Sequence, residues 1–254
     1  MTATVENSAR ITPGIPAVLL VGGMGTRLRS VLPSTPKPLA PVGGVPFLEL
    51  LVTQLRAQGI RRLIMCTGHL SDQIERRFGD GRKWNLTIHY SAETRPLGTA
   101  GAIKLAEHLL KDAEDFLVLN GDSFLEMDFH QLIRFHHEHG AVVSMAIRSV
   151  PNAARYGSVR TDKLNRIIAF AEKRGIAEPG LISGGVYVFK SSALKRIPDG
   201  PASLEVDVFP KLLEEGMFAI PQDGLFIDIG TPEDYARAQT LCRDFSQIAE
   251  ARSR

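Results

Sequence analysis

The sequence predicts an α/β protein: a three-layer α/β/α, Rossmann-like domain built on a mixed, mainly parallel sheet. Short apolar runs alternate with longer amphipathic runs through the first half, and this strand–helix alternation favours parallel strands with helices on both faces. Strand signals then come close together from Ala141 to Phe189, which is typical of an antiparallel insertion or lid. The chain of 254 residues is long enough for one such domain with a substantial core.

The expected elements follow from these patterns in chain order. Parallel strands are expected over Ala17–Val21, Leu63–Thr67, Leu86–Tyr90 and Phe116–Asn120. Helices are expected over Pro46–Gln58, Asp72–Phe78, Thr99–Leu110 and Phe129–His139. The closely spaced strands are expected over Val142–Ser149, Gly157–Arg160, Ile167–Glu172 and Ile182–Phe189. A last helix should begin after Thr231, because a Thr N-cap, Pro232 and acidic residues stand in its first turn.

We expect a flexible N-terminal tail over residues 1–14 and a single domain over residues 15–254, with a lid region inserted at about residues 141–215. The sequence shows no internal repeat and no low-complexity segment.

Composition excludes several classes of protein. The net charge of +2 and the lack of a long Lys/Arg run argue against a nucleic-acid partner. No apolar run approaches the roughly 18 residues that span a membrane, and the first fourteen residues lack the apolar stretch of a signal peptide. Cys66 and Cys242 are expected to be reduced thiols, and the protein is expected to be cytoplasmic.

A glycine-rich loop follows the first expected strand directly. Glycines let backbone N–H groups approach an anion closely, and two cations follow, one of them held between prolines in a stiff segment. The loop and its cations, which we interpret as a polyphosphate cradle, are Gly22, Gly23, Gly25, Thr26, Arg27 and Lys37. The loop lacks the Lys-Ser/Thr of a Walker A motif and the third glycine of a dinucleotide fingerprint. A glycine-rich turn without a ligand is the alternative.

Two aspartates follow apolar runs and should lie at one edge of the sheet. Asp122 comes after Phe116–Leu119, and Asp228 comes after Leu225–Ile227. Two carboxylates that face a phosphate cradle need a cation between them, and Mg²⁺ prefers oxygen ligands of this kind. Taken singly, each aspartate is equally explained as a turn or helix-capping residue.

The ordered motifs resemble the sugar-1-phosphate nucleotidylyltransferases. The matching strings are Gly22–Leu28 with Pro36–Leu39, Pro96–Gly101, Leu119–Asp122, Glu172–Lys173, Ser183–Gly185 and Asp228–Thr231. The resemblance covers about residues 15–238 and is greatest to the D-glycero-α-D-manno-heptose 1-phosphate guanylyltransferases, on Arg29–Val31, Pro46–Glu49 and Pro96–Thr99. It implies the nucleotide-diphospho-sugar transferase fold and transfer of a nucleoside monophosphate, with release of pyrophosphate.

The resemblance implies catalytic roles for Arg27, Lys37 and Asp122. Arg27 would hold the β- and γ-phosphates, and Lys37 would neutralise charge near the α-phosphate. Asp122 and Asp228 would hold Mg²⁺, the one expected cofactor. A sugar 1-phosphate is largely a dianion at neutral pH and can attack without a general base, so catalysis would be positioning and charge stabilisation.

The resemblance also implies where the two substrates bind. The nucleobase would pack on Pro96, Leu97, Gly98 and Thr99, with Thr99 as the N-cap of the next helix and Glu93 reading a guanine edge. The sugar phosphate would contact Glu172, Lys173, Ser183, Gly184 and Gly185. For each set a structural reading competes: a solvated carboxylate for Glu93, a strand-end charge pair for Glu172 and Lys173, and a β-bulge for the two glycines. Ser183 stands where the family often has asparagine, which puts the sugar contact in doubt.

The expected partners are therefore a nucleoside triphosphate, with GTP favoured, and a sugar 1-phosphate of the heptose or mannose type. Nucleic acid and membrane are not expected as partners, and a homodimer is compatible with this reading. Uridylyl transfer to another sugar phosphate and a non-catalytic nucleotide-sugar sensor are the alternatives. A glycosyltransferase ranks last, because it has no need for a loop that holds a free triphosphate.

Overall fold

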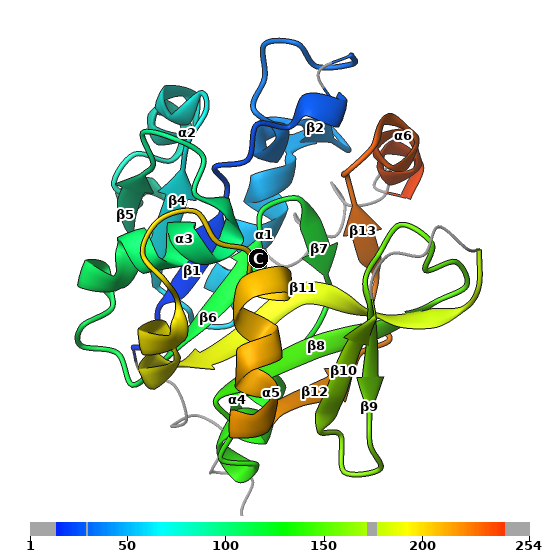
Figure 1. Cartoon of the computed structure of the whole chain (residues 1–254). Helices are drawn as coiled ribbons and strands as arrows, with labels where there is room; N and C mark the ends of the chain where they lie inside the picture. Colours follow the sequence, from blue (N-terminus) through cyan, green and yellow to red (C-terminus); the bar gives the residue numbers. More distant parts are fainter. Residues whose placement is uncertain (1–13, 29, 172–176, 242–254) are drawn as a thin grey trace, which may run out of the picture.

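The structure is a computed structural model, and it describes residues 14–28, 30–171 and 177–241. A nine-stranded mixed sheet runs through the molecule (Figure 1). Its parallel half contains β5 (Thr87–Ala92), β4 (Arg62–Thr67), β1 (Ala17–Leu20) and β6 (Asp115–Asn120), in that spatial order. Each of these strands lies within two residues of its expected bounds, so the short apolar runs located the parallel strands correctly.

The second half of the sheet is built on β11 (Gly180–Lys190), which pairs antiparallel with β6. β8 (Val143–Val150) runs antiparallel to β11, and β12 (Met217–Pro221) runs parallel to β8. β9 (Ser158–Thr161) and β10 (Ile167–Ala171) form a hairpin that branches from the outer part of β11. The closely spaced strand signals after residue 141 are thus confirmed as strands, and they extend the central sheet.

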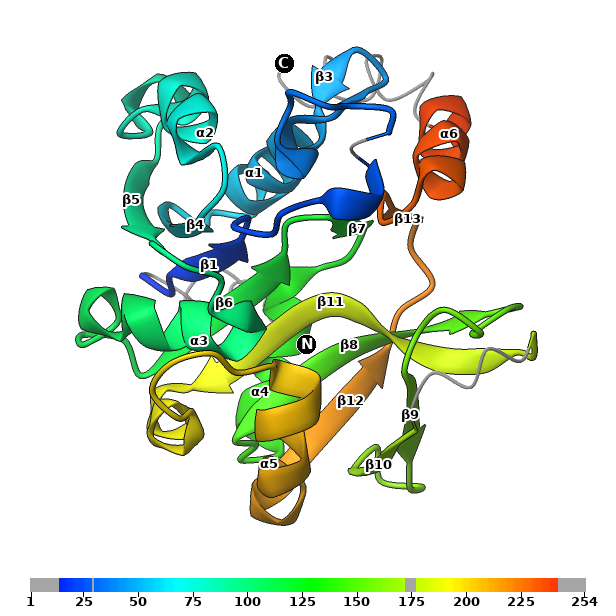
Figure 2. The same ribbon diagram turned by 45° about the horizontal axis from the view of Figure 1, so that its top comes forward.

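Helices cover both faces of this sheet. The helices are α1 (Phe47–Ala57), α2 (Ser71–Phe78), α3 (Gly98–Leu105), α4 (Phe129–Glu138), α5 (Phe209–Gly216) and α6 (Pro232–Leu241). α1 and α2 lie on one side of the parallel strands and α3 lies on the other (Figure 2). Successive residues of a strand point to opposite faces, so Leu19 joins one hydrophobic cluster and Val18 joins the other. The three-layer mixed α/β prediction is confirmed.

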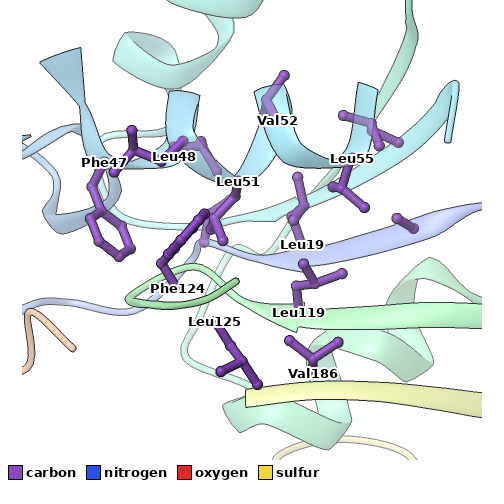
Figure 3. Close-up of a cluster of buried hydrophobic side chains, with 14 of the residues drawn as sticks. Leu19, Phe47, Leu48, Leu51, Val52, Leu55, Leu119, Phe124, Leu125 and Val186 are labelled. Carbon is purple, nitrogen blue, oxygen red and sulfur yellow. The ribbon is translucent and has the colours of Figure 1, made fainter. Parts of the chain in front are cut away.

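The core between α1 and the sheet shows why these residues form these layers. Leu51 and Leu55 of α1 point down onto Leu19 of β1 and Leu119 of β6 (Figure 3). All four are at most 1% exposed. Burial of such leucines contributes about 1.5–3 kcal/mol each, which fixes α1 over the strands that lead to the glycine loop.

Two small ribbons lie outside the main sheet. β7 (Ser123–Leu125) pairs antiparallel with β13 (Phe226–Asp228), and β2 (Pro41–Val42) pairs with β3 (Val45–Pro46). The β7–β13 ribbon places the residue after β6 beside the start of α6, although about one hundred residues of sequence separate them. This ribbon brings the two candidate aspartates together.

Some elements differ from the expectation. The helix expected over Thr99–Leu110 is α-helical only to Leu105 and continues as a 3-10 helix over Ala106–Leu109. The segment after β11 had no expected elements, yet it forms the 3-10 helix Ser191–Arg196, the π-helix Leu204–Val208, α5 and β12. Short 3-10 turns also form at Thr26–Leu28, Lys37–Leu39 and Arg82–Trp84.

Candidate active site

The carboxyl ends of the parallel strands meet at one edge of the sheet. Val21 N–H donates to the Cys66 carbonyl at 2.9 Å, which holds the start of the glycine loop against the end of β4. Gly121 N–H donates to the Leu20 carbonyl at 3.0 Å, which holds the loop after β6 against the end of β1. In open α/β sheets this edge is where ligands bind.

The glycine loop keeps its conformation through two positions. Gly25 has φ +57°, a left-handed conformation that disfavours other residues, and a Cβ there would lie 3.2 Å from Lys37 Cβ. Leu28 is buried, and its N–H donates to the Gly25 carbonyl at 2.9 Å. Arg27, between these anchors, is exposed and forms no ion pair with another residue that the structure describes. The loop therefore presents Arg27 to solvent from a fixed base.

A small cavity of about 10 Å³, with room for about one water molecule, lies beside this loop. It is lined by Gly23, Gly25, Lys37, His69 and Leu70, together with neighbouring residues of the loop. His69 and Leu70 follow β4, and sequence reasoning did not single them out. The pocket lies where the sequence predicts a polyphosphate cradle.

Lys37 and Asp122 form an ion pair, with Lys37 Nζ 2.6 Å from Asp122 Oδ2. The lysine side chain is 12% exposed, whereas the aspartate is 46% exposed. Pro36 is extended, with φ −62° and ψ 139°, and the Lys37–Leu39 turn follows it, so the lysine stands on the stiff segment that the prolines predict. A mostly buried ammonium is thus held at the end of β6.

Asp228 lies beside this pair at the end of β13. The backbone N–H of Ile229 donates to the Asp122 carbonyl at 3.0 Å, which joins the two aspartate-bearing turns. Burial raises the pKa of Asp228, and the Asp122 carboxylate raises it further. Hydrogen bonds from the Gly230 N–H and the Tyr156 hydroxyl, and the charge of Lys37, act in the opposite direction but do not outweigh these effects.

The two carboxylates fit a hard divalent cation. The Asp122 carboxylate lies close enough to Asp228 to disfavour its ionisation, and a cation between them would relieve that repulsion. Mg²⁺ is usually held by one or two carboxylates, with phosphate oxygens and water as its other ligands. Among the described residues no group of three or more His, Cys, Asp or Glu side chains is arranged to hold a metal. The donor set therefore suits an ion that arrives with phosphates rather than a closed protein site.

The loop expected to lie near the nucleobase is held by groups that are distant in sequence. Glu93 Oε2 accepts the Leu97 N–H at 3.0 Å, so one carboxylate oxygen already orders the turn. Gly98 has φ +71°, and a Cβ there would lie 2.6 Å from the Ala202 carbonyl oxygen. That carbonyl also accepts the Ala100 N–H at 3.0 Å. Gly98 is thus required by this close approach.

The expected N-cap role of Thr99 is wrong. α3 begins at Gly98 and has no side-chain cap, and the Ala202 carbonyl accepts the N–H groups of Ala100 and Gly101 in its first turn. The Thr99 hydroxyl instead accepts the Leu204 N–H at 2.8 Å. The loop and the π-helix segment therefore stabilise each other.

Ser183, Gly184 and Gly185 lie where the pairing of β11 with β8 is interrupted. Gly185 has φ +74°, and a Cβ on Gly184 would lie 2.6 Å from Leu125 Cδ2. The Ser183 hydroxyl is 2.9 Å from the Tyr187 hydroxyl and accepts the Gly185 N–H at 3.1 Å. The β-bulge alone explains both glycines, and their contact with a sugar stays a prediction. Glu172 and Lys173 lie outside the described residues.

Three residues near the aspartates were not assigned a role from sequence. The Asn120 side chain hydrogen-bonds with Tyr187 below the bulge, and Tyr156 hydrogen-bonds with Asp228. Arg155 binds Asp234 at the start of α6, with Nη1 2.5 Å from Oδ2. Asn120 stands inside a quoted motif, but no local pattern marks Arg155 or Tyr156.

In the part of the chain that the structure describes, no helix combines the length and apolarity needed to cross a bilayer.

Two structures of HddC from Yersinia pseudotuberculosis superpose closely on the chain at 33% sequence identity. One has a TM-score of 0.80 and covers 91% of this chain and 100% of that chain. The other, complexed with GMP-PN, has a TM-score of 0.79 and covers 90% of this chain and 99% of that chain.

Sequence comparison gives the same result. The chain is 38% identical over 230 residues to mannose-1-phosphate guanylyltransferase of Mycobacterium tuberculosis, covering 89% of this chain and 64% of the relative. It is also 38% identical over 229 residues to D-glycero-alpha-D-manno-heptose 1-phosphate guanylyltransferase of Aneurinibacillus thermoaerophilus, covering 88% of this chain and 96% of the relative. Residues 16–244 match the family described as nucleotidyl transferase. The chain therefore belongs to the nucleotidyl transferase family, among the sugar-1-phosphate nucleotidylyltransferases.

Proposed function

We propose that this protein transfers the guanylyl group of GTP to a heptose or mannose 1-phosphate and releases pyrophosphate. The observation that carries the proposal is the Lys37–Asp122–Asp228 group at the strand ends, beside the glycine loop. Two relatives named as guanylyltransferases, at equal identity, support GTP and leave both sugars as candidates. The complex of a structural neighbour with GMP-PN also supports a guanine nucleotide.

The phosphates would be held by fixed positive charge. Arg27 stands exposed on the loop and would bind the β- and γ-phosphates, the leaving pyrophosphate. Lys37 is placed at the mouth of β6 and would neutralise charge that develops at the α-phosphate. The attacking sugar phosphate is largely a dianion at neutral pH, so no side chain need remove a proton.

Asp122 and Asp228 would hold Mg²⁺, which when bound supplies charge neutralisation between the phosphate oxygens of the two substrates. The raised pKa of Asp228 follows from its burial and from its closeness to Asp122. Asp228 would then be ionised in the working enzyme, because the bound cation would supply the missing positive charge.

We assign the base to the Pro96–Thr99 loop, which Glu93 and Ala202 hold in place. One oxygen of Glu93 is taken by Leu97, and the other would accept from a guanine N–H. The sugar side of the site would use Ser183 and the charge pair Glu172–Lys173.

Buried Cys66 is a free thiol, in agreement with a cytoplasmic protein.

The test is pyrophosphate release with Mg²⁺ in a matrix of GTP, UTP, CTP, ATP and dTTP against mannose, heptose and glucose 1-phosphates. We expect turnover with GTP and with mannose or heptose 1-phosphate. Turnover with UTP alone would replace the proposal with uridylyl transfer. No turnover, in protein that binds a nucleotide sugar, would replace it with a sensor.

Asp122→Asn tests the proposed metal ligand in the same assay. Asparagine keeps the shape and an oxygen that can accept from Lys37, but it loses the charge that a cation needs. We expect Mg²⁺-supported turnover to fall at least about 100-fold, whereas loss of the ion pair should lower the melting temperature by only roughly 2–4 °C. Activity like that of the unchanged protein would remove Asp122 from the metal site.

A further inference from the structure

A chain of polar contacts leads from the start of α6 to Asp228. Arg155, which lies between β8 and β9, has Nη1 2.5 Å from Asp234 Oδ2 and 3.0 Å from Thr231 Oγ1. Thr231 Oγ1 also accepts the Asp234 N–H at 3.2 Å, so it caps α6 as the sequence predicts. Arg155 is therefore anchored on the first turn of a helix. Its other terminal nitrogen, Nη2, donates to the Tyr156 hydroxyl at 3.2 Å.

The direction of these hydrogen bonds follows from the groups involved. A guanidinium only donates, so the Tyr156 oxygen accepts from Arg155. The hydroxyl proton is then left to donate, and the Asp228 carboxylate lies close enough to Tyr156 to accept it. Asp228 Oδ1 accepts the Gly230 N–H at 2.5 Å. The Gly230 N–H and the Tyr156 hydroxyl are thus two donors that this carboxylate can use.

Tyr156 and Asp228 line one pocket. Its volume is about 520 Å³, and Arg155, Phe226 and Asp234 also contribute to its walls. The Tyr156 ring meets the Phe226 ring edge-on, with ring centroids 6.4 Å apart, and this contact holds the ring against β13. Asp228 therefore lines the same pocket as Tyr156, whose ring is packed against the strand that carries Asp228.

We propose that Tyr156, held by Arg155, is a positioning residue that orients Asp228 for the divalent cation. The inference rests on the proposed function in so far as Asp228 is taken as a metal ligand. Partners that orient a metal-binding carboxylate restrict it to the geometry that coordination needs, and their loss weakens metal binding. In this protein the partner comes from the segment before β9, so that segment and the metal site are mechanically joined.

The test replaces Tyr156 with phenylalanine, which removes only the hydroxyl. The matched control is Tyr90→Phe on β5, because the Tyr90 hydroxyl donates to the Gly79 carbonyl at 2.7 Å, far along the chain from the aspartates. Mn²⁺ binding to the protein with GTP is measured by electron paramagnetic resonance, beside the Mg²⁺ concentration that gives half-maximal turnover. Tyr156→Phe should weaken both about tenfold, and saturating Mg²⁺ should restore the rate. Tyr90→Phe should change neither.

Unchanged Mn²⁺ binding in Tyr156→Phe would overturn the proposal, whatever its melting temperature. Arg155→Met tests whether Arg155 acts through Tyr156. It should weaken Mn²⁺ binding when Tyr156 is present and add nothing in the Tyr156→Phe background. Losses that add in the double variant would show that Arg155 acts separately, which would overturn its role in holding Tyr156.

The metal titration keeps this proposal separate from the proposed reaction. If no sugar phosphate is turned over but Tyr156→Phe still weakens Mn²⁺ binding, the positioning role stands and the proposed function fails. If guanylyl transfer is found and Mn²⁺ binding is unchanged, the function stands and the positioning role fails.

Discussion

Lys37→Met separates the catalytic and the structural contributions of the lysine. Methionine keeps the apolar stem and removes the ammonium, which lies 2.6 Å from Asp122 Oδ2. A hydrogen bond to a charged group contributes about 1.5–3 kcal/mol. Because the Asp122 side chain is 46% exposed, water can solvate it once the lysine is gone, which reduces the expected cost to about 1 kcal/mol. For a chain of this size that corresponds to a fall of roughly 2–4 °C in melting temperature.

The expected loss of activity is much larger than this loss of stability. Removal of one group that stabilises developing charge lowers kcat by about 100- to 1,000-fold. The assay is the rate of pyrophosphate release at saturating GTP and sugar phosphate, with the melting temperature measured on the same samples.

Lys104→Met is the control for the same substitution. Lys104 Nζ lies 2.8 Å from Glu107 Oε2, with side chains 21% and 41% exposed, so the pair resembles Lys37–Asp122 in its surroundings. It should lose similar stability and keep full activity. A Lys37→Met variant that melts lower but turns over at the normal rate would show that Lys37 only supports the fold.

Two further predictions test the loop and a remote charge cluster. Gly25→Ala should lower the free energy of unfolding by about 1 kcal/mol, because alanine disfavours the left-handed backbone. It should also lower kcat/KM about tenfold by displacing Lys37. Gly59→Ala is the control: Gly59 has φ +82° and no atom near its Cβ, so the variant should lose stability and keep its kcat/KM. Asp115 is partly buried, which raises its pKa, but hydrogen bonds from two histidines near the end of α4 outweigh this and lower it. Its contribution to stability is therefore present above the ordinary Asp pKa of about 3.9 and is lost as pH falls through the lower folded-state value. Asp115→Asn should melt lower than the unchanged protein at pH 7 and approach it below about pH 4, and a constant difference across that range would contradict this account.

The sequence predicted the parts of the fold that local patterns determine. The apolar strand Ala17–Leu20 and the glycines after it are contiguous, so the strand, the loop and the edge of the sheet could be placed together. The segment that contains Ala202 and α5 could not be predicted in this way. A π-helix and a helix that begins with proline interrupt the usual periodic pattern there. The start of α3 depends on the Ala202 carbonyl, about one hundred residues away, and no local signal near Thr99 reports it.

The candidate site divides in the same way. Lys37 and Asp122 each stand next to a strand or a stiff turn, so their positions followed from the spacing of motifs. The orientation of Asp228 depends on Tyr156 and Arg155, which come from a connection whose course only the folded chain defines. Local pattern therefore gives the residues that carry charge, whereas the residues that orient those charges come from tertiary contacts.

The aspartate pair also explains why so many hydrogen bonds converge on this edge of the sheet. Burial and Asp122 both disfavour the charged form of Asp228, so ionising it works against folding, and that cost is present once the pH rises above its raised pKa. Lys37 offsets part of it by pairing with Asp122. The Gly230 N–H and the Tyr156 hydroxyl offset more by donating to the Asp228 carboxylate. A protein selected for stability alone would place neutral side chains here. The arrangement makes sense if a divalent cation completes it, because the same unfavourable pair then becomes the strongest reason for the cation to bind.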